Sequence, residues 1–429
     1  MADTVILGSG VIGLSTAYYL LQHQSGSTIH LVDSANELFA SASGFAGGFL
    51  AKDWFRPELA ALAALSFEEH RRLAEQENGR DNWGYAKSVT LSYDPDGSLT
   101  MIGGGGKKKR GEDWLLEGTS RAGLVDARRE LEDGEVPAWL RRTDGDSVRV
   151  IDDGSGTAIV DPLRFCKFLL EKVKAAGVQI HNPAVATRLE TDEAGKLSGV
   201  AVSHPDGSDE TVIIPASRVL LSAGCWTPHV FHDLFKNRYY IDIPIESLGG
   251  HSLVVKAPQK VTTCHSVYTT MDGLSPEVYS RPDGVIYVAG VNHASIPLPK
   301  PRVKAVTFDE SVQKLKDIAR RLIATPEGGQ EEDLEIVREG LCFRPITKRG
   351  TPYIARLPED KLGEDFTTAR GGGGDGAEGG SGLGLGGGGV FIAAGHGPWG
   401  ISLSLGTGKV MAEMMSGKPL SADISSLGF

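Results

Sequence analysis

A glycine-rich turn near the start of the chain strongly restricts its fold. In the stretch VILGSGVIG, Gly8, Gly10 and Gly13 form a GxGxxG motif between a short apolar run and a helical pattern. The first glycine permits a tight turn, the second admits a pyrophosphate close to the backbone, and the third lets helix and strand pack closely. Asp33 follows the next predicted strand, residues 28–32, where a ribose hydroxyl would lie. This order predicts a Rossmann-type unit that binds a dinucleotide, with its phosphates at the positive end of the helix dipole.

Composition excludes several classes of protein. At 429 residues and 40% hydrophobic content, the chain can bury a large core, and we expect two domains. Its formal net charge of -11 disfavours a nucleic-acid partner. No apolar stretch is long enough to cross a bilayer, and the first strand leaves no room for a leader segment. The four cysteines lie far apart, without a CxxC pair, which argues against a disulfide framework or a metal site. We therefore expect a cytoplasmic protein.

Helix and strand signals continue along the chain after the first unit. Ser66 and Glu69 form a capping box that predicts the start of a helix. Asp161 and Pro162 predict another helix start, and Gly177 predicts the end of that helix. Strands are also predicted at residues 178–189, 199–203, 211–221, 252–256, 285–289 and 390–394, and helices at residues 308–322 and 407–415.

These segments group into two domains, each of which is discontinuous in sequence. We assign to the nucleotide-binding domain residues 1–82, 150–243 and 335–429. We assign to the inserted domain residues 83–149 and 244–334. The prediction is therefore an α/β fold in which a Rossmann-type domain carries an inserted α+β domain, built on a mostly antiparallel sheet. Residues 371–389 are rich in glycine and low in complexity, which predicts a flexible surface loop.

The chain resembles the D-amino-acid-oxidase-like superfamily of FAD enzymes, which includes glycine oxidase, sarcosine oxidase and the fructosyl amino acid oxidases. The resemblance covers nearly the whole chain and depends on the order of its motifs. These motifs are the glycine turn with Asp33, the small-residue loop at 41–48, SAGCW at 222–226, FRPIT at 343–347 with GTP at 350–352, and the terminal stretch at 395–408, which begins GHGPWG. The glycine turn alone would permit NAD. The C-terminal Gly-His segment and the helix after it are similar to the flavin-contacting end of the family, so the resemblance implies FAD.

The motif and the resemblance together assign a set of cofactor-binding residues. This set is Gly8, Gly10, Val11, Ile12, Gly13, Asp33, Ser34, Ser41, Ser43, Gly47, Gly48, Val185, Ala223, Gly224, Trp226, Cys342, Gly395, His396, Gly397, Trp399 and Gly400. Asp33 would accept hydrogen bonds from the adenosine ribose, and Val185 would hold adenine through its backbone. The helix after Gly406 would direct its positive end at the flavin, and His396 is a catalytic candidate beside it. Ordinary structural roles for Ser41, Val185 and His396 are the alternatives.

Arg344 is the main candidate for binding substrate. The resemblance implies that it holds a substrate carboxylate, as the arginine of a similar Arg-Pro segment does in glycine oxidase. A guanidinium offers the flat, two-pronged donor that a carboxylate requires. An interdomain or surface ion pair is the alternative. Trp226, Tyr287 and Trp399 are candidates for pocket walls, with plain core packing as their alternative.

Three departures from the family pattern leave parts of the chemistry open. Cys342 lies at a place similar to that of a cysteine bonded to the flavin in sarcosine and fructosyl amino acid oxidases, whereas the glycine oxidase type lacks that bond. Free cysteines are usually small buried hydrophobes, which favours noncovalent FAD. A noncationic residue near Tyr287 replaces the lysine that activates dioxygen in sarcosine oxidase, so oxidase and dehydrogenase both remain open. Pro398 and Trp399 replace substrate-side residues of many relatives, so specificity does not carry over.

The resulting prediction is an FAD-dependent oxidoreductase that oxidises the C–N bond of a small amino acid or secondary amine. The expected chemistry is hydride transfer to flavin N5, with dioxygen as the electron acceptor. One alternative is a nicotinamide-dependent dehydrogenase built on the same turn. Another is a flavin-binding protein without catalytic activity that works through partners.

Overall fold

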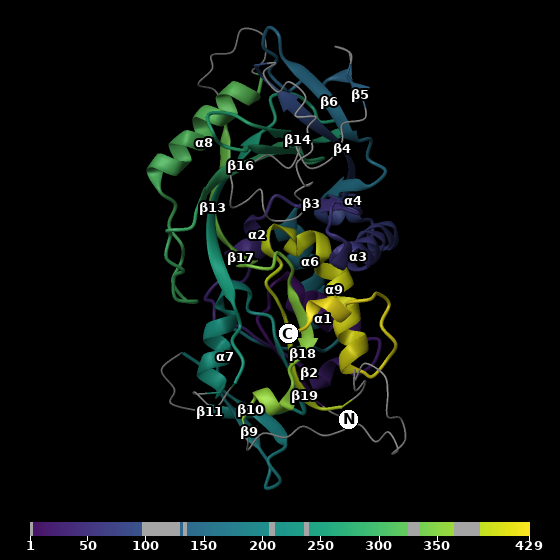
Figure 1. Cartoon of the computed structure of the whole chain (residues 1–429), viewed down its shortest axis with the longest axis vertical. Coiled ribbons are helices and arrows are strands. Elements are labelled where there is room, and N and C mark those ends of the chain that lie inside the picture. The colour runs from purple at the N-terminus through teal and green to yellow at the C-terminus, as the bar shows by residue number, and fades with distance from the viewer. Residues whose placement is uncertain are drawn as a thin grey trace.

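The computed structural model, drawn in Figure 1, describes most of the chain. The described ranges are residues 3–96, 129–131, 135–205, 211–235, 240–324, 334–363 and 387–429. Most of the predicted glycine-rich loop, residues 371–386, lies outside them. Within them the chain forms three sheets, with the helices packed on and beside them. The fold is mixed α/β, as predicted.

A six-stranded sheet contains the amino-terminal strand of the chain. Its order is β18-β19-β12-β1-β2-β8, and all neighbours are parallel except the β18–β19 pair. The strands are β1 (Thr4–Leu7), β2 (Ile29–Val32), β8 (Gln179–His181), β12 (Arg218–Leu221), β18 (Tyr353–Arg356) and β19 (Gly389–Ala394). Helix α1 (Val11–Leu20) connects β1 to β2. The predicted strand–turn–helix–strand unit is therefore confirmed.

The strand predicted at 178–189 is wrong, because two strands in different sheets replace it. β8 ends at His181, and β9 (Val185–Thr191) pairs instead with β10. Pro183 lies between them, and proline cannot donate a hydrogen bond to a strand ladder. The antiparallel three-stranded sheet has the order β11-β10-β9, with β10 at Leu197–Ser203 and β11 at Thr211–Pro215. The predicted strand at 211–221 is likewise divided, into β11 and β12.

A ten-stranded, mostly antiparallel sheet forms the other main part of the structure. Its path runs β17-β13-β16-β15-β14-β4-β6-β5, with β3 and β7 attached beside β4. Its strands are β3 (Phe49–Ala51), β4 (Ala86–Asp94), β5 (Arg129–Glu130), β6 (Ser147–Asp152), β7 (Thr157–Ile159), β13 (Ile245–Lys256), β14 (Cys264–Thr269), β15 (Glu277–Ser280), β16 (Val285–His293) and β17 (Ile336–Thr347). In Figure 1, β13 runs from beside α8 down toward α7.

Strand β17 pairs within this large sheet, although its residues fall in the segment 335–429 that the sequence assigned to nucleotide binding. It pairs with β13 from Ile245 opposite Thr347 to Val255 opposite Ile336. Hydrophobic periodicity identifies a strand but does not identify its partner, so the sequence could not place β17. The domain boundaries themselves stay a prediction.

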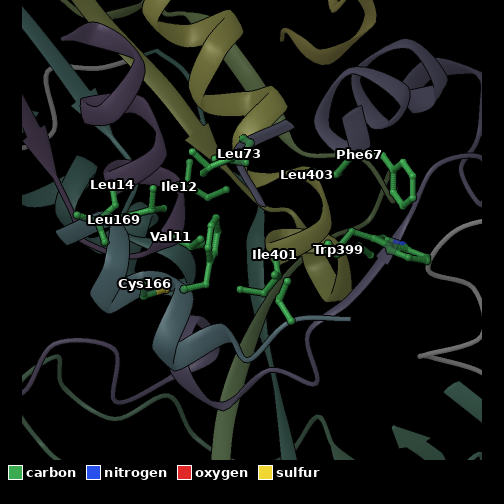
Figure 2. Packing of buried hydrophobic residues seen from close by; sticks show 14 of the residues in the cluster. Val11, Ile12, Leu14, Phe67, Leu73, Cys166, Leu169, Trp399, Ile401 and Leu403 are labelled. Carbon is green, nitrogen blue, oxygen red and sulfur yellow. The ribbon is translucent and has the colours of Figure 1, made fainter. Parts of the chain in front are cut away.

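Four helices form the packed layer beside the six-stranded sheet. They are α1, α3 (Pro57–Gln76), α6 (Pro162–Ala175) and α9 (Gly400–Met415). Figure 2 shows their apolar side chains meeting, among them Leu14, Leu169 and Leu403. Asp161 caps α6 by accepting the Arg164 N–H at 3.0 Å, as predicted.

Two helix starts were predicted too late. Helix α9 begins seven residues before the predicted position 407, because its first turns are buried on all sides and show no amphipathic period. Helix α3 begins at Pro57, so the capping box predicted at Ser66 and Glu69 is wrong. Both residues are buried, and Ser66 Oγ accepts the Gly406 N–H at 3.0 Å. Their polar groups join α3 to α9 instead of starting a helix.

The remaining helices are short or peripheral. Helix α8 (Asp309–Leu322) packs its apolar face on β13 and β16, where Figure 1 shows it along the outer side of the sheet. The others are α2 (Ala42–Phe45), α4 (Gly79–Trp83) and α7 (Thr227–Phe235), with single 3-10 turns η1 (Gly26–Thr28), η4 (Gly224–Trp226), η5 (Glu359–Lys361), η6 (Gly397–Trp399) and η7 (Ser425–Leu427).

Candidate active site

A cavity of about 800 Å³ lies between the carboxyl ends of β1 and β2 and one face of the ten-stranded sheet. Its volume is within the range of cofactor and ligand pockets, about 300–1,000 Å³. Every predicted site residue lines it except Gly13 and Trp399. The cavity thus brings together segments from residue 8 to residue 400, which is the arrangement that a single extended ligand requires.

The glycine turn forms one end of this cavity. Gly8 has a φ of +107°, which side chains rarely adopt, and a Cβ there would lie 2.6 Å from the Ser222 carbonyl oxygen. A Cβ on Gly13 would collide with the Gly8 carbonyl oxygen, so Gly13 acts by letting α1 approach the turn and not by lining the cavity. Gly10 caps α1 without a side-chain hydrogen bond. The turn and the amino end of α1 therefore fit a pyrophosphate, as predicted for a dinucleotide.

Asp33 lies directly after β2 at the same end of the cavity. Its Oδ2 accepts the Ser9 N–H at 2.7 Å, and its Oδ1 accepts the Ala35 N–H at 2.9 Å. Burial raises the pKa of Asp33, and the two backbone hydrogen bonds oppose this increase. A carboxylate fixed in this way beside the glycine turn fits the ribose of a dinucleotide.

The second small-residue loop lies against the turn. Ser43 Oγ accepts the Val11 N–H at 3.0 Å, and Ser41, Gly47 and Gly48 line the cavity. Arg281, which is only 2% exposed, holds this loop in place. Its Nη2 donates to the Gly47 carbonyl at 2.8 Å, and its Nη1 donates to Asp161 Oδ2 at 3.1 Å. Arg281 is a positioning residue that the sequence analysis missed, because no motif surrounds it.

Residues of β9, η4 and the following loop form the next part of the wall. Val185, Ala223, Gly224 and Trp226 all line the cavity. The Trp226 indole Nε1 donates to the Pro299 carbonyl at 2.8 Å. This bond connects η4 to residues 298–305, which also line the cavity and lie between β16 and α8. Trp226 therefore forms part of the cavity wall.

The carboxyl-terminal segment reaches the cavity through Gly395, His396, Gly397 and Gly400. His396 is 2% exposed, and its Nε2 lies 3.1 Å from Thr407 Oγ1. Burial lowers the pKa of His396 to about 3, so the imidazole is neutral at physiological pH. A neutral ring carries no positive charge, although its N–H can still donate a hydrogen bond. The amino end of α9, which begins at Gly400, would supply positive potential to a ligand.

Trp399 is a core residue and does not line the cavity. Its ring lies 4.5 Å from that of Phe55, and its exposed fraction is 3%. The prediction that Trp399 forms a pocket wall or contacts the cofactor therefore lacks support, because Trp399 is not among the residues that line the cavity. Its alternative, core packing, describes what it does.

One face of the ten-stranded sheet forms the far wall of the cavity. Cys342 and Arg344 reach it from β17, and Asn292 reaches it from β16. Arg344 Nη1 donates to Asn292 Oδ1 at 2.7 Å. Gly250 of β13, opposite Cys342, makes room for this pair: a Cβ there would collide with the Arg344 guanidinium and lie 2.8 Å from Asn292 Oδ1. Asn292 and Gly250 were missed because only strand pairing brings them beside Arg344.

Aromatic residues cover the same wall nearer β15. The rings of Tyr287 and Tyr279 stack with centroids 5.7 Å apart, and Phe49 stacks on Tyr279 at 5.8 Å. Burial raises the pKa of Tyr287 to about 12, and the nearby positive charge of Arg344 opposes this increase. Glu277 of β15 also lines the cavity and was missed by sequence analysis. The wall thus combines a guanidinium, a carboxylate and neutral aromatic rings.

In the part of the chain that the structure describes, none of the helices combines the length and apolarity needed to span a bilayer. Within the same ranges, no cluster of three or more His, Cys, Asp or Glu side chains is arranged to bind a metal ion.

Comparison with known proteins agrees with this geometry. A putative oxidoreductase of Schizosaccharomyces pombe is 27% identical over 445 aligned residues, covering 99% of this chain and 97% of that protein. Glycine oxidase from Geobacillus kaustophilus superposes with a TM-score of 0.67 at 18% identity, covering 100% of this chain and 98% of that one. L-proline dehydrogenase from P. horikoshii superposes with a TM-score of 0.68 at 13% identity, covering 100% and 96%. At these identities the two structures establish similarity of fold alone.

A family match decides between the dinucleotides that the glycine turn permits. Residues 3–414 match the DAO family, described as FAD dependent oxidoreductase. The match includes the glycine turn, the second loop, the Arg344 strand and the carboxyl-terminal segment that together line the cavity. The chain therefore belongs to the DAO family of FAD-dependent oxidoreductases.

Proposed function

We propose that this protein oxidises the C–N bond of a small amino acid or secondary amine. The observation that carries the proposal is the Arg344–Asn292 pair on the cavity wall opposite the glycine turn. An arginine held by a hydrogen bond at 2.7 Å has a fixed orientation, and its planar donors match a carboxylate. This pair supports the proposal that the substrate carries a carboxylate.

The proposed reaction needs orientation more than acid–base catalysis. Bound FAD would supply the acceptor for the hydride that leaves the substrate carbon. The substrate nitrogen loses a proton to solvent, the C–N bond becomes an imine, and water hydrolyses the imine to a carbonyl compound and ammonia, or a primary amine where the substrate is a secondary amine. Arg344 and Asn292 would fix one end of the substrate, and the stacked rings of Tyr279 and Tyr287 would exclude water from the other.

The glycine turn, the 41–48 loop and the amino ends of α1 and α9 would hold the cofactor. The assigned contacts to the glycine turn, Asp33, the 41–48 loop and the 395–400 segment remain part of this proposal. We propose noncovalent FAD. Cys342 lines the cavity and is 3% exposed, so the covalent alternative has a direct test. After acid precipitation, noncovalent FAD leaves its yellow colour in the supernatant, and a link through Cys342 leaves it in the pellet.

Dioxygen is the proposed electron acceptor. The test is to reduce the bound flavin with substrate without air and then to follow its reoxidation in aerated buffer. Reoxidation within the turnover time indicates an oxidase. Reoxidation that is much slower, and accelerated by an artificial acceptor, indicates a dehydrogenase.

The experiment that tests the function is anaerobic mixing of the purified holoprotein with a panel of amino acids and secondary amines. Loss of flavin absorbance with a carboxylate-bearing amine supports the proposal. A flavin that stays oxidised with the whole panel indicates the alternative of a flavin-binding protein without catalytic activity. A colourless protein that binds only a nicotinamide nucleotide contradicts the cofactor and the function together.

A substitution at Arg344 tests the role of the guanidinium. We expect Arg344→Ala to lower kcat/KM for a carboxylate substrate by about tenfold to a hundredfold, because charge-assisted hydrogen bonds contribute about 1.5–3 kcal/mol. Arg344→Lys keeps the positive charge but loses the planar pair of N–H donors, so we expect it to recover only part of the lost kcat/KM. Flavin content serves as the control. Unchanged kinetics in both variants would reject the proposed carboxylate site.

A further inference from the structure

Glu277 places a carboxylate on the same cavity wall as Arg344. It is the first residue of β15 and lines the cavity together with Tyr279, two residues later on the same face of the strand. The Tyr279 hydroxyl donates to Glu277 Oε2 at 2.6 Å, and the Tyr268 hydroxyl lies 3.0 Å from that of Tyr279. The tyrosine network orients this carboxylate, because a hydroxyl that donates to an anion forms a short, strong hydrogen bond.

The surroundings of Glu277 favour a positively charged ligand group. Tyr279 and Tyr287 stack with an interplanar angle of 13°, and both rings line the cavity beside the carboxylate. Phe49 also stacks on Tyr279, so these rings pack on one another and shield the Glu277 carboxylate from water, which strengthens its attraction for a cation. A carboxylate next to aromatic rings is therefore a recognition site for an organic cation.

Strand register separates this site from the carboxylate-binding pair. Glu277 lies opposite Ala289 of β16, whereas Asn292, which holds Arg344, lies three residues further along β16. Neighbouring strands lie about 4.8 Å apart, and successive residues along a strand rise about 3.3 Å. The positive and negative ends of the wall are thus offset from each other along the sheet, and one elongated ligand can contact both.

The chemistry of C–N oxidation indicates which nitrogen Glu277 binds. Hydride leaves the carbon only when the adjacent nitrogen has its lone pair available, so the reacting amine must be uncharged. A carboxylate close to an amine favours the protonated form. Glu277 beside the reacting nitrogen would therefore oppose the reaction, whereas beside a second nitrogen it would only contribute binding.

We propose that the substrate carries two charged ends: a carboxylate that binds Arg344, and a second, distal cationic nitrogen that binds Glu277. This inference rests on the function proposed above and names its substrate class, amino acids or N-substituted amino acids with a basic side chain. Glu277 is then a specificity-determining residue that contacts the substrate away from the reacting atoms.

A binding experiment on the holoprotein tests the two-ended site without turnover. Isothermal titration calorimetry would compare ω-amino acids of four to eight carbons with straight-chain acids of the same length. We expect the best ω-amino acid to bind about tenfold or more tightly than its matched acid. Glu277→Gln should abolish this difference, and the control Glu246→Gln, on β13 and 60% exposed, should retain it. Equal affinities in the native protein, or an unchanged difference in Glu277→Gln, would overturn the inference.

A kinetic experiment separates this inference from the proposed function. Both enantiomers of lysine and ornithine would be compared with norleucine and norvaline as anaerobic reductants of the bound flavin. We expect kcat/KM to favour the basic members by about tenfold or more in the native protein and by little in Glu277→Gln. If no amine or amino acid reduces the flavin, the proposed function fails. If reduction occurs without a preference for the basic members, or if Glu277→Gln slows both classes equally, only the two-ended substrate is wrong.

Discussion

The most discriminating prediction concerns Gly250, which does not itself line the cavity. A Cβ added there would lie 2.7 Å from Arg344 Cζ and 2.8 Å from Asn292 Oδ1, closer than side-chain atoms pack. Both groups are ends of flexible side chains, so they can move away while the strand stays in place. We therefore expect Gly250→Ala to retain the fold and the flavin but to displace the guanidinium from its hydrogen bond with Asn292.

The magnitude follows from the interactions that are lost. Displacing the guanidinium would remove the charge-assisted hydrogen bonds proposed for the substrate carboxylate, about 1.5–3 kcal/mol, or about tenfold to a hundredfold in kcat/KM. Because the methyl group acts through Arg344, the effects of Gly250→Ala and Arg344→Ala should not add in the double variant. Anaerobic flavin reduction gives the kinetics, and thermal unfolding with flavin absorbance reports the fold.

Gly249→Ala is the matched control, because it adds a methyl group to the opposite face of β13, where the nearest atom is Ile296 Cδ1 at 3.0 Å. We expect this variant to leave the carboxylate site unchanged. Native kinetics in Gly250→Ala would refute the reasoning, and so would full additivity with Arg344→Ala. A colourless, unfolded Gly250→Ala protein would show that the strand, and not the side chains, gives way.

Three further predictions concern the cofactor end and stability. Asp33→Ala should weaken FAD binding by about tenfold or more, measured by flavin fluorescence on dilution, and retained affinity would contradict a ribose contact. Arg281→Met should loosen the 46–47 loop and lower both the melting temperature and flavin content, since it leaves Asp161 without its buried partner. Burial lowers the pKa of His70 to about 4, whereas in the unfolded chain it is about 6.5. Between these values the unfolded chain binds a proton that the folded one does not, so the melting temperature should fall as the pH is lowered from 6.5 to 4. His70→Gln should reduce the change of melting temperature with pH. An equal change in the variant would mean that other groups cause the pH dependence.

Local signals were sufficient where a structural feature depends on neighbouring residues. The glycine turn, α1, β2 and the cap of α6 at Asp161 follow from spacing within a few residues, and all were predicted. The start of α9 was missed because residues 401–408 are uniformly buried, and a helix buried on all sides has no polar face to show its period.

Prediction failed where the structure depends on contacts between distant segments. Asn292 meets Arg344 only because β13 pairs with both β16 and β17, and nothing around residue 292 marks it as a ligand for an arginine. Glu277 has an ordinary strand sequence around it, and only the cavity identifies it. In both cases the role proposed for the residue depends on the strand order, which hydrophobic periodicity does not contain.

The division of the cavity between two sheets has a consequence for how such an enzyme can change. The glycine turn and Asp33 belong to the six-stranded sheet, whereas Arg344, Asn292 and Glu277 all project from one face of the ten-stranded sheet. If the proposed roles hold, substitutions on that single face should alter which molecules are accepted, while the backbone contacts of the glycine turn to the nucleotide stay intact. Selection can thus act on substrate choice and on cofactor retention as two separate traits, and directed evolution of new specificity should begin on β15 and β16.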